Sequence, residues 1–295
     1  MDEQAALDLL ANTLAHAGDD AAVVDDTAIT TDMLHETTDF PAGTTRYTAG
    51  WRAVAASLSD LAAMGASPTA AVAAYADTAF DADSLSAFVS GARDVCESVD
   101  ADYVGGDLDT HQEFTVATTA IGDVSDPVYR SGATVGDRVV VTGTFGRSAA
   151  ALAFFEQRPS PAHVDRANEL FRFHPRVAAG RALAGSATAM MDSSDGLARS
   201  LHQLAAASDC GIELDRAAVP ADDAVADAFD TAVEQWEATA FFGEDFELVA
   251  TISADDLDAV RAETSTPLTV VGRVVDADRG VVIDGEPLAD RGYTH

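Results

Sequence analysis

The 295-residue chain contains no lysine and only two cysteines. Cys96 and Cys210 lie far apart and in no metal-ligand spacing, which argues against a disulfide framework and a zinc site. No apolar run approaches the ~18 uncharged residues that a membrane helix needs. The N-terminal stretch MDEQAALDLLANTLAHAGDD lacks the basic start and the long apolar core of a secretion signal. We therefore expect a cytoplasmic protein.

Positive charge is also scarce. The chain has 17 arginines against 50 acidic residues, which gives a formal net charge of −33. Such a surface repels nucleic acids and anionic membranes, so we expect neither as a partner. Acidic residues and alanine in place of lysine are typical of a protein adapted to molar salt, in which a Debye length of roughly 3 Å screens self-repulsion. We therefore expect a halophilic cytosol. In such a chain any single aspartate is more often surface charge than ligand.

The length and the 47% hydrophobic content suit two domains, each with a core of its own. Segments with strand-like and helix-like patterns are mixed along the chain, which predicts an α/β fold. Residues 123–137, DVSDPVYRSGATVGD, are rich in turn residues and resemble a linker. We therefore predict an N-terminal domain at 1–125 and a C-terminal domain at 126–295.

The apolar patterns predict the following elements. In the first domain, strands are expected at 21–24, 27–34, 70–76, 103–106 and 113–122, and helices at 50–65 and 81–100. The second of these helices is amphipathic, with apolar residues at Leu85, Phe88, Val89, Val95 and Val99. In the second domain, strands are expected at 137–143, 246–252, 269–275 and 280–285, helices at 148–157 and 175–183, and a strand leading into a helix within 188–208.

Residues 18–32, GDDAAVVDDTAITTD, thread five aspartates through a short apolar run. If the chain turns at Asp25–Asp26, antiparallel pairing places Asp20 opposite Thr31 and beside Asp32. The aspartates at the turn are ordinary turn residues, and we interpret them as structural and solvated. Asp20 and Asp32 would share the open end of one hairpin.

Other acidic residues have apolar neighbours, unlike surface charges. Asp60 lies in SLSDLAAMGAS, Asp107 follows two glycines in YVGGDL, and Asp192 and Asp195 flank two serines in MMDSSDGL. Burying such carboxylates unpaired is costly, and no arginine is adjacent in sequence. Mg²⁺ would offset that cost, because it binds a few carboxylates and completes its shell with water and substrate phosphates.

Three further motifs are weaker on their own. MMDSSDGL leads from a strand into a helix, whose N-terminus either holds a phosphate or is simply capped by Ser or Asp. VTGTFGRS, residues 141–148, lacks the lysine of a P-loop, which excludes that motif. FFGEDFEL places Glu244 and Asp245 among glycine and apolar residues.

Taken in chain order, GDDAAV, TTDML, SLSDLAAMGASP, GGD, RSGATVGD, VTGTFGRSAAAL, DSSDGL and GEDFEL resemble the successive motifs of thiamine-monophosphate kinases. This family belongs to the ATP-binding superfamily named for aminoimidazole ribonucleotide synthetase, and the resemblance runs from about residue 18 to the C-terminus. It implies a homodimer in which the N-terminal sheets of two subunits form a barrel, an α/β sandwich as C-terminal domain, and ATP in the cleft between the domains.

The resemblance also implies ATP-dependent phosphorylation of thiamine monophosphate to thiamine diphosphate with several Mg²⁺ ions. By position, the family's metal-binding residues match Asp20, Thr30, Thr31, Asp32, Asp60, Asp107, Asp192 and Asp195. Its ATP contacts match Gly106, Asp107, Arg130 and Ser194, and a substrate contact matches Glu244. Catalysis would rest on the carboxylates that bridge the protein to the metals, Asp20, Asp32, Asp60, Asp107 and Asp192.

Three positions depart from the family pattern around the substrate. Asp39 stands where a substrate-contacting histidine is usual, and it could favour a cationic thiazolium. Asp290, in LADRGYTH, stands at the position of a C-terminal aromatic residue, with Tyr293 nearby. Phe242–Gly243 replaces the usual pair of glycines.

Phosphoryl transfer needs two phosphate chains held in line and the developing charge neutralised. The acceptor phosphate is already anionic at neutral pH, so we expect direct transfer without a strong general base or a phosphoenzyme. Arg130 would offset phosphate charge from the ATP side, and we interpret the other arginines as surface or interface residues.

Two other kinds of function compete with this prediction. Aminoimidazole ribonucleotide synthetase is the enzymatic alternative, whereas a hydrogenase-maturation protein would need a C-terminal cysteine and a selenophosphate synthetase a reactive cysteine or selenocysteine with a lysine. The other alternative is a non-catalytic ATP- or metal-binding module. Retention of every predicted metal ligand argues against it, because a retired site is free to lose them.

Overall fold

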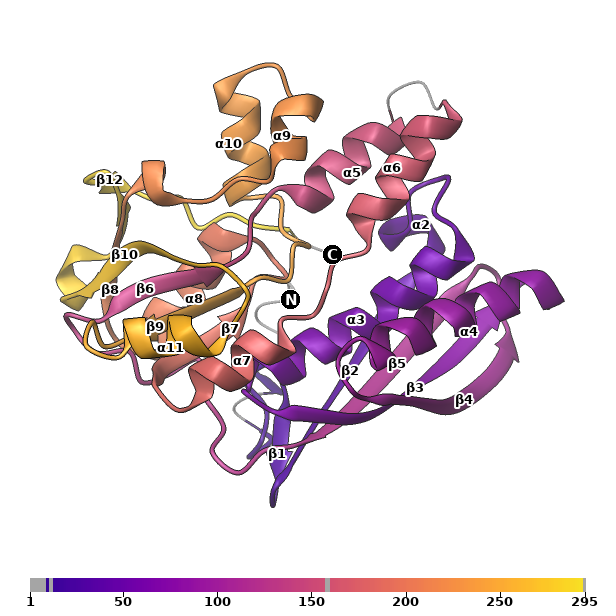
Figure 1. Ribbon diagram of the computed structural model, residues 1–295, viewed down its shortest axis with the longest axis horizontal. Coiled ribbons are helices and arrows are strands. Elements are labelled where there is room, and N and C mark those ends of the chain that lie inside the picture. The colour runs from indigo at the N-terminus through magenta and orange to yellow at the C-terminus, as the bar shows by residue number, and fades with distance from the viewer. Residues whose placement is uncertain (1–8, 11–12, 157–159, 294–295) are drawn as a thin grey trace.

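A computed structural model describes residues 9–10, 13–156 and 160–293. Three of the predicted segments extend beyond these residues: the N-terminal stretch, the end of the helix expected at 148–157, and the last residues of LADRGYTH. Within the described residues, two mixed sheets lie side by side and helices cover them (Figure 1).

The first half of the chain forms the five-stranded sheet and its covering helices. Its elements are β1 (Ala22–Val24), β2 (Thr27–His35), α2 (Glu36–Asp39), α3 (Arg46–Ala63), β3 (Ser67–Asp77), α4 (Ala82–Glu97), β4 (Asp102–Thr110) and β5 (Thr115–Asp123). The strand order is β1-β2-β5-β3-β4, and only β3 and β4 run parallel. The β1–β2 hairpin pairs Val24 with Thr27 around Asp25–Asp26, as the sequence predicts.

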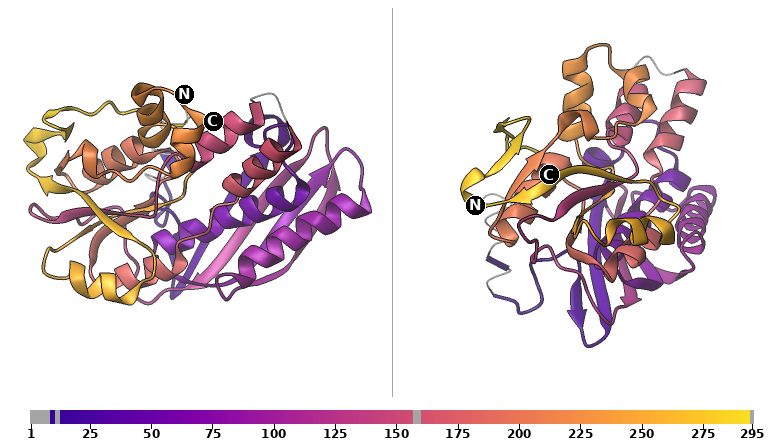
Figure 2. Two further views of the ribbon diagram at one scale, coloured as in Figure 1. Left: turned by 45° about the horizontal axis from the view of Figure 1, so that its top comes forward. Right: turned by 60° about the vertical axis from the view of Figure 1, so that its left-hand side comes forward.

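Helices α3 and α4 cover one face of this sheet (Figure 2). The other face carries apolar side chains that are 37% to 61% exposed, namely Ile29, Met33, Val72 and Ile121. The sheet does not close on itself within the described residues of one chain.

The second half forms a seven-stranded sheet in the order β12-β11-β8-β10-β6-β9-β7. Its elements are β6 (Arg138–Thr142), α5 (Arg147–Glu156), α6 (Pro161–Phe171), α7 (Val177–Ala184), β7 (Ala187–Asp192), α8 (Leu197–Ala207), β8 (Gly211–Leu214), α9 (Asp223–Ala228), α10 (Ala232–Ala240), β9 (Leu248–Ile252), α11 (Leu257–Glu263), β10 (Leu268–Val275), β11 (Val281–Ile283) and β12 (Glu286–Pro287). Helix α8 packs on one face, and α7 and α11 pack on the other.

The helix pair α5–α6 connects the two halves. It follows β6 in the sequence, but Ala150, Phe155 and Leu170 pack into the core of the first half beside α3 (Figure 1). The last strand of the first sheet, β5, ends at Asp123, and the first strand of the second sheet, β6, begins at Arg138. Helices α5 and α6 follow β6, but they pack on the core of the first sheet. The domain ranges 1–125 and 126–295 therefore stay a prediction.

The predicted two-domain α/β architecture with mixed sheets is confirmed. Helices α2, α6, α9, α10 and α11 and strands β8 and β12 were not predicted. Frequent acidic and small residues obscure the apolar period of α6, α9 and α10. Val89, on the predicted apolar face of α4, is 39% exposed, because it lines a groove between α4 and β4 together with Leu85 and Phe88. In the part of the chain that is described, no helix is long and apolar enough to span a membrane.

Candidate active site

Three carboxylates from distant parts of the sequence meet where α3 packs against β7. Asp20, Asp60 and Asp192 each offer one oxygen, and these oxygens lie within 4.8 Å of one another. The Asp20 side chain is 2% exposed, and Asp192 is 1% exposed. Converging carboxylate oxygens of this kind suit a hard divalent cation such as Mg²⁺.

Two serines of α3 orient two of the predicted metal ligands. Ser57 Oγ donates to Asp32 Oδ2 at 2.6 Å, and Ser59 Oγ donates to Asp192 Oδ2 at 2.7 Å. Both serines are fully buried, since the small residues of α3 let the helix approach β2 and β7 closely. The helix therefore joins the hairpin carboxylate to the carboxylate at the end of β7.

The predicted threonine pair divides between the two faces of β2. Thr30 faces α3, and its Oγ1 donates to Asp60 Oδ2 at 2.5 Å. Thr31 is exposed on the opposite face, and its hydroxyl donates to the carbonyl of Thr118. In this arrangement the Thr30 side chain contacts the carboxylate cluster, whereas the Thr31 side chain points away from it.

Mutual repulsion and burial disfavour the charged forms of these carboxyls. Burial, followed by the charges of Asp32, Asp192 and Asp20, raises the pKa of Asp60 well above its ordinary value. Burial, followed by the charge of Asp20, raises the pKa of Asp192 to about 7. Burial also raises the pKa of Asp32. Buried like charges of this kind favour a bound cation, and carboxyls with raised pKa values cluster at functional sites.

Arg130 places a positive charge beside Asp20. Its Nη2 lies 2.7 Å from Asp20 Oδ1, and its backbone N–H donates to Asp19 Oδ1 at 2.7 Å. Burial alone would lower the pKa of Arg130, but the bond and charge of Asp20 raise it, so the guanidinium stays charged. Arg130 thus stands beside the carboxylates, where it can share a phosphate oxygen with a cation.

The DSSDG segment forms a tight loop between β7 and α8. No side chain caps α8, whose N-cap residue Gly196 has φ 103°, so capping by Ser or Asp is not the role of this motif. Ser193 is fully buried, and its hydroxyl has no hydrogen-bond partner among the described residues. The carbonyl of Ser194 accepts the N–H of Glu244 at 2.6 Å. The loop therefore ties Asp192 to the GEDFE segment.

Glu244 lies in a segment of unusual backbone. Gly243, Glu244 and Phe246 have φ values of 86°, 62° and 54°, in the left-handed region. The Glu244 carboxylate pairs with the buried Arg52 at 2.5 Å, and its side chain is 15% exposed. Asp245, next to it, accepts the backbone N–H groups that begin α5, so it is structural.

The three departures from the family pattern lie in different surroundings. Asp39 Oδ2 accepts the backbone N–H of His35 at 2.7 Å. Asp290 has a side chain 51% exposed and pairs with Arg199. Burial, followed by the charges of Glu244 and Asp39, raises the pKa of Tyr293, whose ring also lies 6.3 Å from that of Phe242. Tyr293 is therefore the aromatic residue of the C-terminal segment that lies near Glu244.

Gly106 and Asp107 lie away from the carboxylate cluster of their own chain. Two strands, β5 and β3, separate β4 from β2, and strand alternation points Asp107 to the face opposite α3. Gly106 faces α4 and borders a groove of about 360 Å³ with Tyr75, Leu85 and Phe88. A Cβ at Gly106 would collide with the Ala73 carbonyl, so this position requires glycine.

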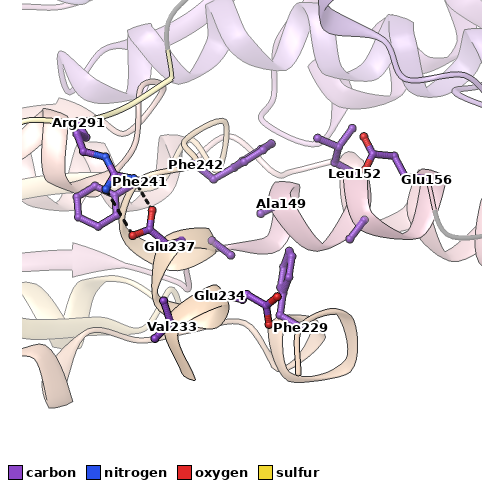
Figure 3. Close-up of a pocket in the computed structure, with 12 residues that line it drawn as sticks. Ala149, Leu152, Glu156, Phe229, Val233, Glu234, Glu237, Phe241, Phe242 and Arg291 are labelled. Carbon is purple, nitrogen blue, oxygen red and sulfur yellow. Dashed lines mark hydrogen bonds and ion pairs between the residues drawn. The ribbon is translucent and has the colours of Figure 1, made fainter. Parts of the chain in front are cut away.

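A more apolar pocket of about 430 Å³ lies between α5 and α10 (Figure 3). Phe229, Phe241 and Phe242 contribute rings to it, and Glu237 pairs with Arg291 at its edge (Figure 3). None of the predicted site residues lines it, so the carboxylate cluster is the better candidate for chemistry. A cavity of about 800 Å³ beside that cluster includes Asp20 and Arg130.

One sequence interpretation is wrong and several site residues were missed. Arginines other than Arg130 were interpreted as surface or interface residues, but Arg52 is 1% exposed inside the chain, where Glu244 neutralises it and two backbone carbonyls accept its hydrogen bonds. Ser57 and Ser59 were missed, although two serines beside Asp60 in a helix of small residues are a usable signal. No sequence signal pairs Arg52 with Glu244, which is 192 residues away.

The two halves of the chain match the family models of one class of proteins, the AIR synthase related proteins. The family model of their N-terminal domain matches residues 18–124, and that of their C-terminal domain matches residues 134–285. Thiamine-monophosphate kinase of Halobacterium salinarum is 61% identical over 100% of both chains, and that of Escherichia coli is 33% identical, covering 94% of this chain and 90% of the other. The chain belongs to the thiamine-monophosphate kinase family.

Solved structures of the same family have the same fold. Thiamine-monophosphate kinase from Stenotrophomonas maltophilia superposes with a TM-score of 0.82 at 31% identity, covering 92% of this chain and 90% of the other. The structure of AaThiL complexed with AMPPCP and TMP superposes with a TM-score of 0.89 at 26% identity, covering 100% of this chain and 97% of the other.

Proposed function

We propose that this protein transfers the terminal phosphoryl group of ATP to thiamine monophosphate and forms thiamine diphosphate. The observation that carries the proposal is the buried cluster of Asp20, Asp60 and Asp192, which holds converging carboxylates in a member of this kinase family. A relative was solved in complex with AMPPCP and TMP, an ATP analogue and the acceptor, which supports the same reaction.

The carboxylate set fits Mg²⁺, since the donors are all oxygens and the pKa values of Asp60 and Asp192 are raised where no cation offsets the charge of the cluster. Bound Mg²⁺ would neutralise the charge that develops on the transferred phosphoryl group. Asp20, Asp32, Asp60 and Asp192 would hold the ions, Ser57 and Ser59 would orient two of these carboxylates, and Arg130 would bind a phosphate oxygen. The acceptor phosphate is anionic at neutral pH, so the protein needs no strong general base.

On the acceptor side, we assign Glu244 and Asp39 to the cationic thiazolium. Both carboxylates raise the pKa of Tyr293, so the three groups share one region. Tyr293 supplies an aromatic surface there, whereas Asp290 binds Arg199 and serves the fold of the C-terminal segment. Asp195, within the same loop as Ser194, would complete the metal and phosphate contacts.

A direct test compares possible acceptors in high KCl with Mg²⁺ and ATP. Thiamine monophosphate is expected to be converted to thiamine diphosphate with one ADP formed per product, whereas thiamine itself is not phosphorylated. ATP consumption only with the acceptor of aminoimidazole ribonucleotide synthetase would favour that enzyme. ATP binding without any product would favour a non-catalytic module.

We also propose that the protein acts as a homodimer whose subunits share each site. The outer face of the five-stranded sheet exposes apolar side chains, and a second copy packed on it would bury Ile29, Met33, Val72 and Ile121. Asp107 points to that same face. A second subunit is thus the simplest source of the Gly106–Asp107 contact with ATP, and a barrel formed by two sheets would provide it.

Complementation between two inactive variants tests this shared site. Co-expression of Asp60→Asn with Asp107→Asn is expected to restore about one quarter of wild-type activity, since half of random dimers are mixed and each mixed dimer keeps one intact site of two. If both residues served a site within one chain, every site would carry a defect and no activity would return.

The charge of the chain indicates the salt concentration at which the protein works. A net charge of −33 and the absence of lysine support a protein of high-salt cytoplasm. Activity assays therefore belong in concentrated KCl.

A further inference from the structure

Arg52 is a buried cation that no step of the proposed reaction requires. It lies on α3, is 1% exposed, and uses Nη2 to bind both the carboxylate of Glu244 at 2.5 Å and its backbone carbonyl at 3.2 Å. Its Nη1 donates to the carbonyl of Phe171 at 2.9 Å. A buried guanidinium is costly unless its donors are bonded, so these partners hold it in one orientation.

Aromatic rings fix the same guanidinium from its faces. The guanidinium carbon lies 3.8 Å from the centroid of Phe171, 5.4 Å from that of Phe173 and 5.6 Å from that of Phe246. Phe173 and Phe246 stack on each other with centroids 4.2 Å apart. Cation–π attraction and stacking therefore restrict the rotamers of Arg52, and the segment that carries Glu244 contributes one of the rings.

The backbone of Glu244 requires support from outside its own segment. A non-glycine residue at φ 62° is strained, and Phe246 at φ 54° repeats the strain two residues later. Ser148 Oγ donates to the Glu244 carbonyl at 2.6 Å, and Arg52 donates to the same oxygen. Arg52 is the one of these two donors that also binds the carboxylate.

We propose that Arg52 is a positioning residue for the phosphoryl acceptor, holding Glu244 in its left-handed conformation with its carboxylate toward the cationic heterocycle. This inference rests on the proposed function. Asp60 follows Arg52 by eight residues on α3, which is about 12 Å along a helix. One rigid helix thus sets the separation between the acceptor's cationic end and the metal cluster at its phosphate end.

The chain offers a matched control for this arrangement. Arg176 pairs with Glu247 at 2.5 Å, and Glu247 belongs to the same segment as Glu244. The side chain of Glu247 is 4% exposed, and it binds Thr142 and Arg176 within the second half of the molecule. Loss of Arg176 removes a partly buried ion pair from this segment without touching the Glu244 carboxylate.

The test measures KM for thiamine monophosphate and for ATP separately in Arg52→Lys and Arg176→Lys. A lysine at position 52 keeps the charge but cannot bond the carboxylate and the carbonyls together. We expect Arg52→Lys to raise KM for thiamine monophosphate about 10-fold or more, while KM for ATP changes less than about 2-fold. Arg176→Lys is expected to lower Tm without this selective rise.

Equal changes in both KM values for Arg52→Lys, or the same selective rise in Arg176→Lys, would overturn the inference. If Arg52→Lys does not fold, the double variant Arg52→Met, Glu244→Gln provides the test. Its KM for thiamine monophosphate should equal that of Glu244→Gln alone, because Arg52 acts through Glu244. A further rise in this KM would contradict the inference. Wild-type protein that forms no thiamine diphosphate would contradict the proposed function itself. An active wild type with variants that change both KM values equally would contradict only the role of Arg52.

Discussion

Replacing Asp60 by Asn is expected to lower the rate of thiamine diphosphate formation about 1,000-fold and to raise the stability of the metal-free protein. The rate falls because a carboxylate that would hold Mg²⁺ at the transferred phosphoryl group is lost. Stability rises because Asp32, Asp192 and Asp20 all repel the charge of Asp60 in the absence of a cation. Asparagine still accepts the hydrogen bond from Thr30, so the change is nearly isosteric.

Steady-state kinetics and thermal unfolding in EDTA check the two effects. Without metal, Tm is expected to rise by at least about 2 °C, the shift that roughly 1 kcal/mol gives in a chain of this size. Asp26→Asn is the control, since Asp26 is exposed at the turn between β1 and β2 and should change neither quantity. A lower metal-free Tm together with unchanged turnover would make Asp60 a structural residue and contradict the account.

The stabilisation of the protein by Mg²⁺ is expected to be larger at pH 8 than at pH 5. Asp192 has a folded-state pKa of about 7 against an ordinary value of 3.8. Between roughly pH 4 and pH 7 the folded protein therefore binds more protons than the unfolded chain, so metal-free stability falls as pH rises. One such carboxyl changes the free energy of unfolding by on the order of 4 kcal/mol over this window. A cation that binds the charged form restores that loss at pH 8 and has less to restore at pH 5.

Thermal unfolding in concentrated KCl at both pH values, with EDTA and with Mg²⁺, measures this difference. High salt screens the surface carboxylates, and their titration affects both samples alike. Asp192→Asn is expected to flatten the pH dependence of the metal-free Tm. An equal Mg²⁺-dependent rise in Tm at pH 5 and pH 8 would show that the cation does not bind these buried carboxyls.

The sequence predicted the elements and carboxylates whose signals are local. The β1–β2 hairpin follows from two apolar runs around Asp25–Asp26, and its observed register extrapolates to Asp20 opposite Thr31. Asp60 and Asp192 stood out because acidic residues among Ala, Met and Leu are costly to bury without a partner. The structure brings these aspartates together, and their roles as metal ligands remain our proposal.

Features that depend on tertiary packing were not predictable in the same way. Arg52 and Glu244 are 192 residues apart, so only the folded chain brings them together. Arg130 pairs with Asp20 over 110 residues for the same reason. Asp107 follows a clear GGD motif, but the motif does not reveal that β4 carries it away from its own cluster. These contacts arise from sheet order and helix packing, which local periodicity does not encode.

The most direct test of phosphoryl transfer at the aspartate cluster is product analysis of the purified protein in concentrated KCl with ATP and thiamine monophosphate, titrated with Mg²⁺. Thiamine diphosphate should appear in a 1:1 ratio with ADP, only with Mg²⁺, and about 1,000-fold more slowly with Asp60→Asn. Product formed at the same rate by wild type and Asp60→Asn, or formed without a divalent cation, would contradict phosphoryl transfer at the aspartate cluster.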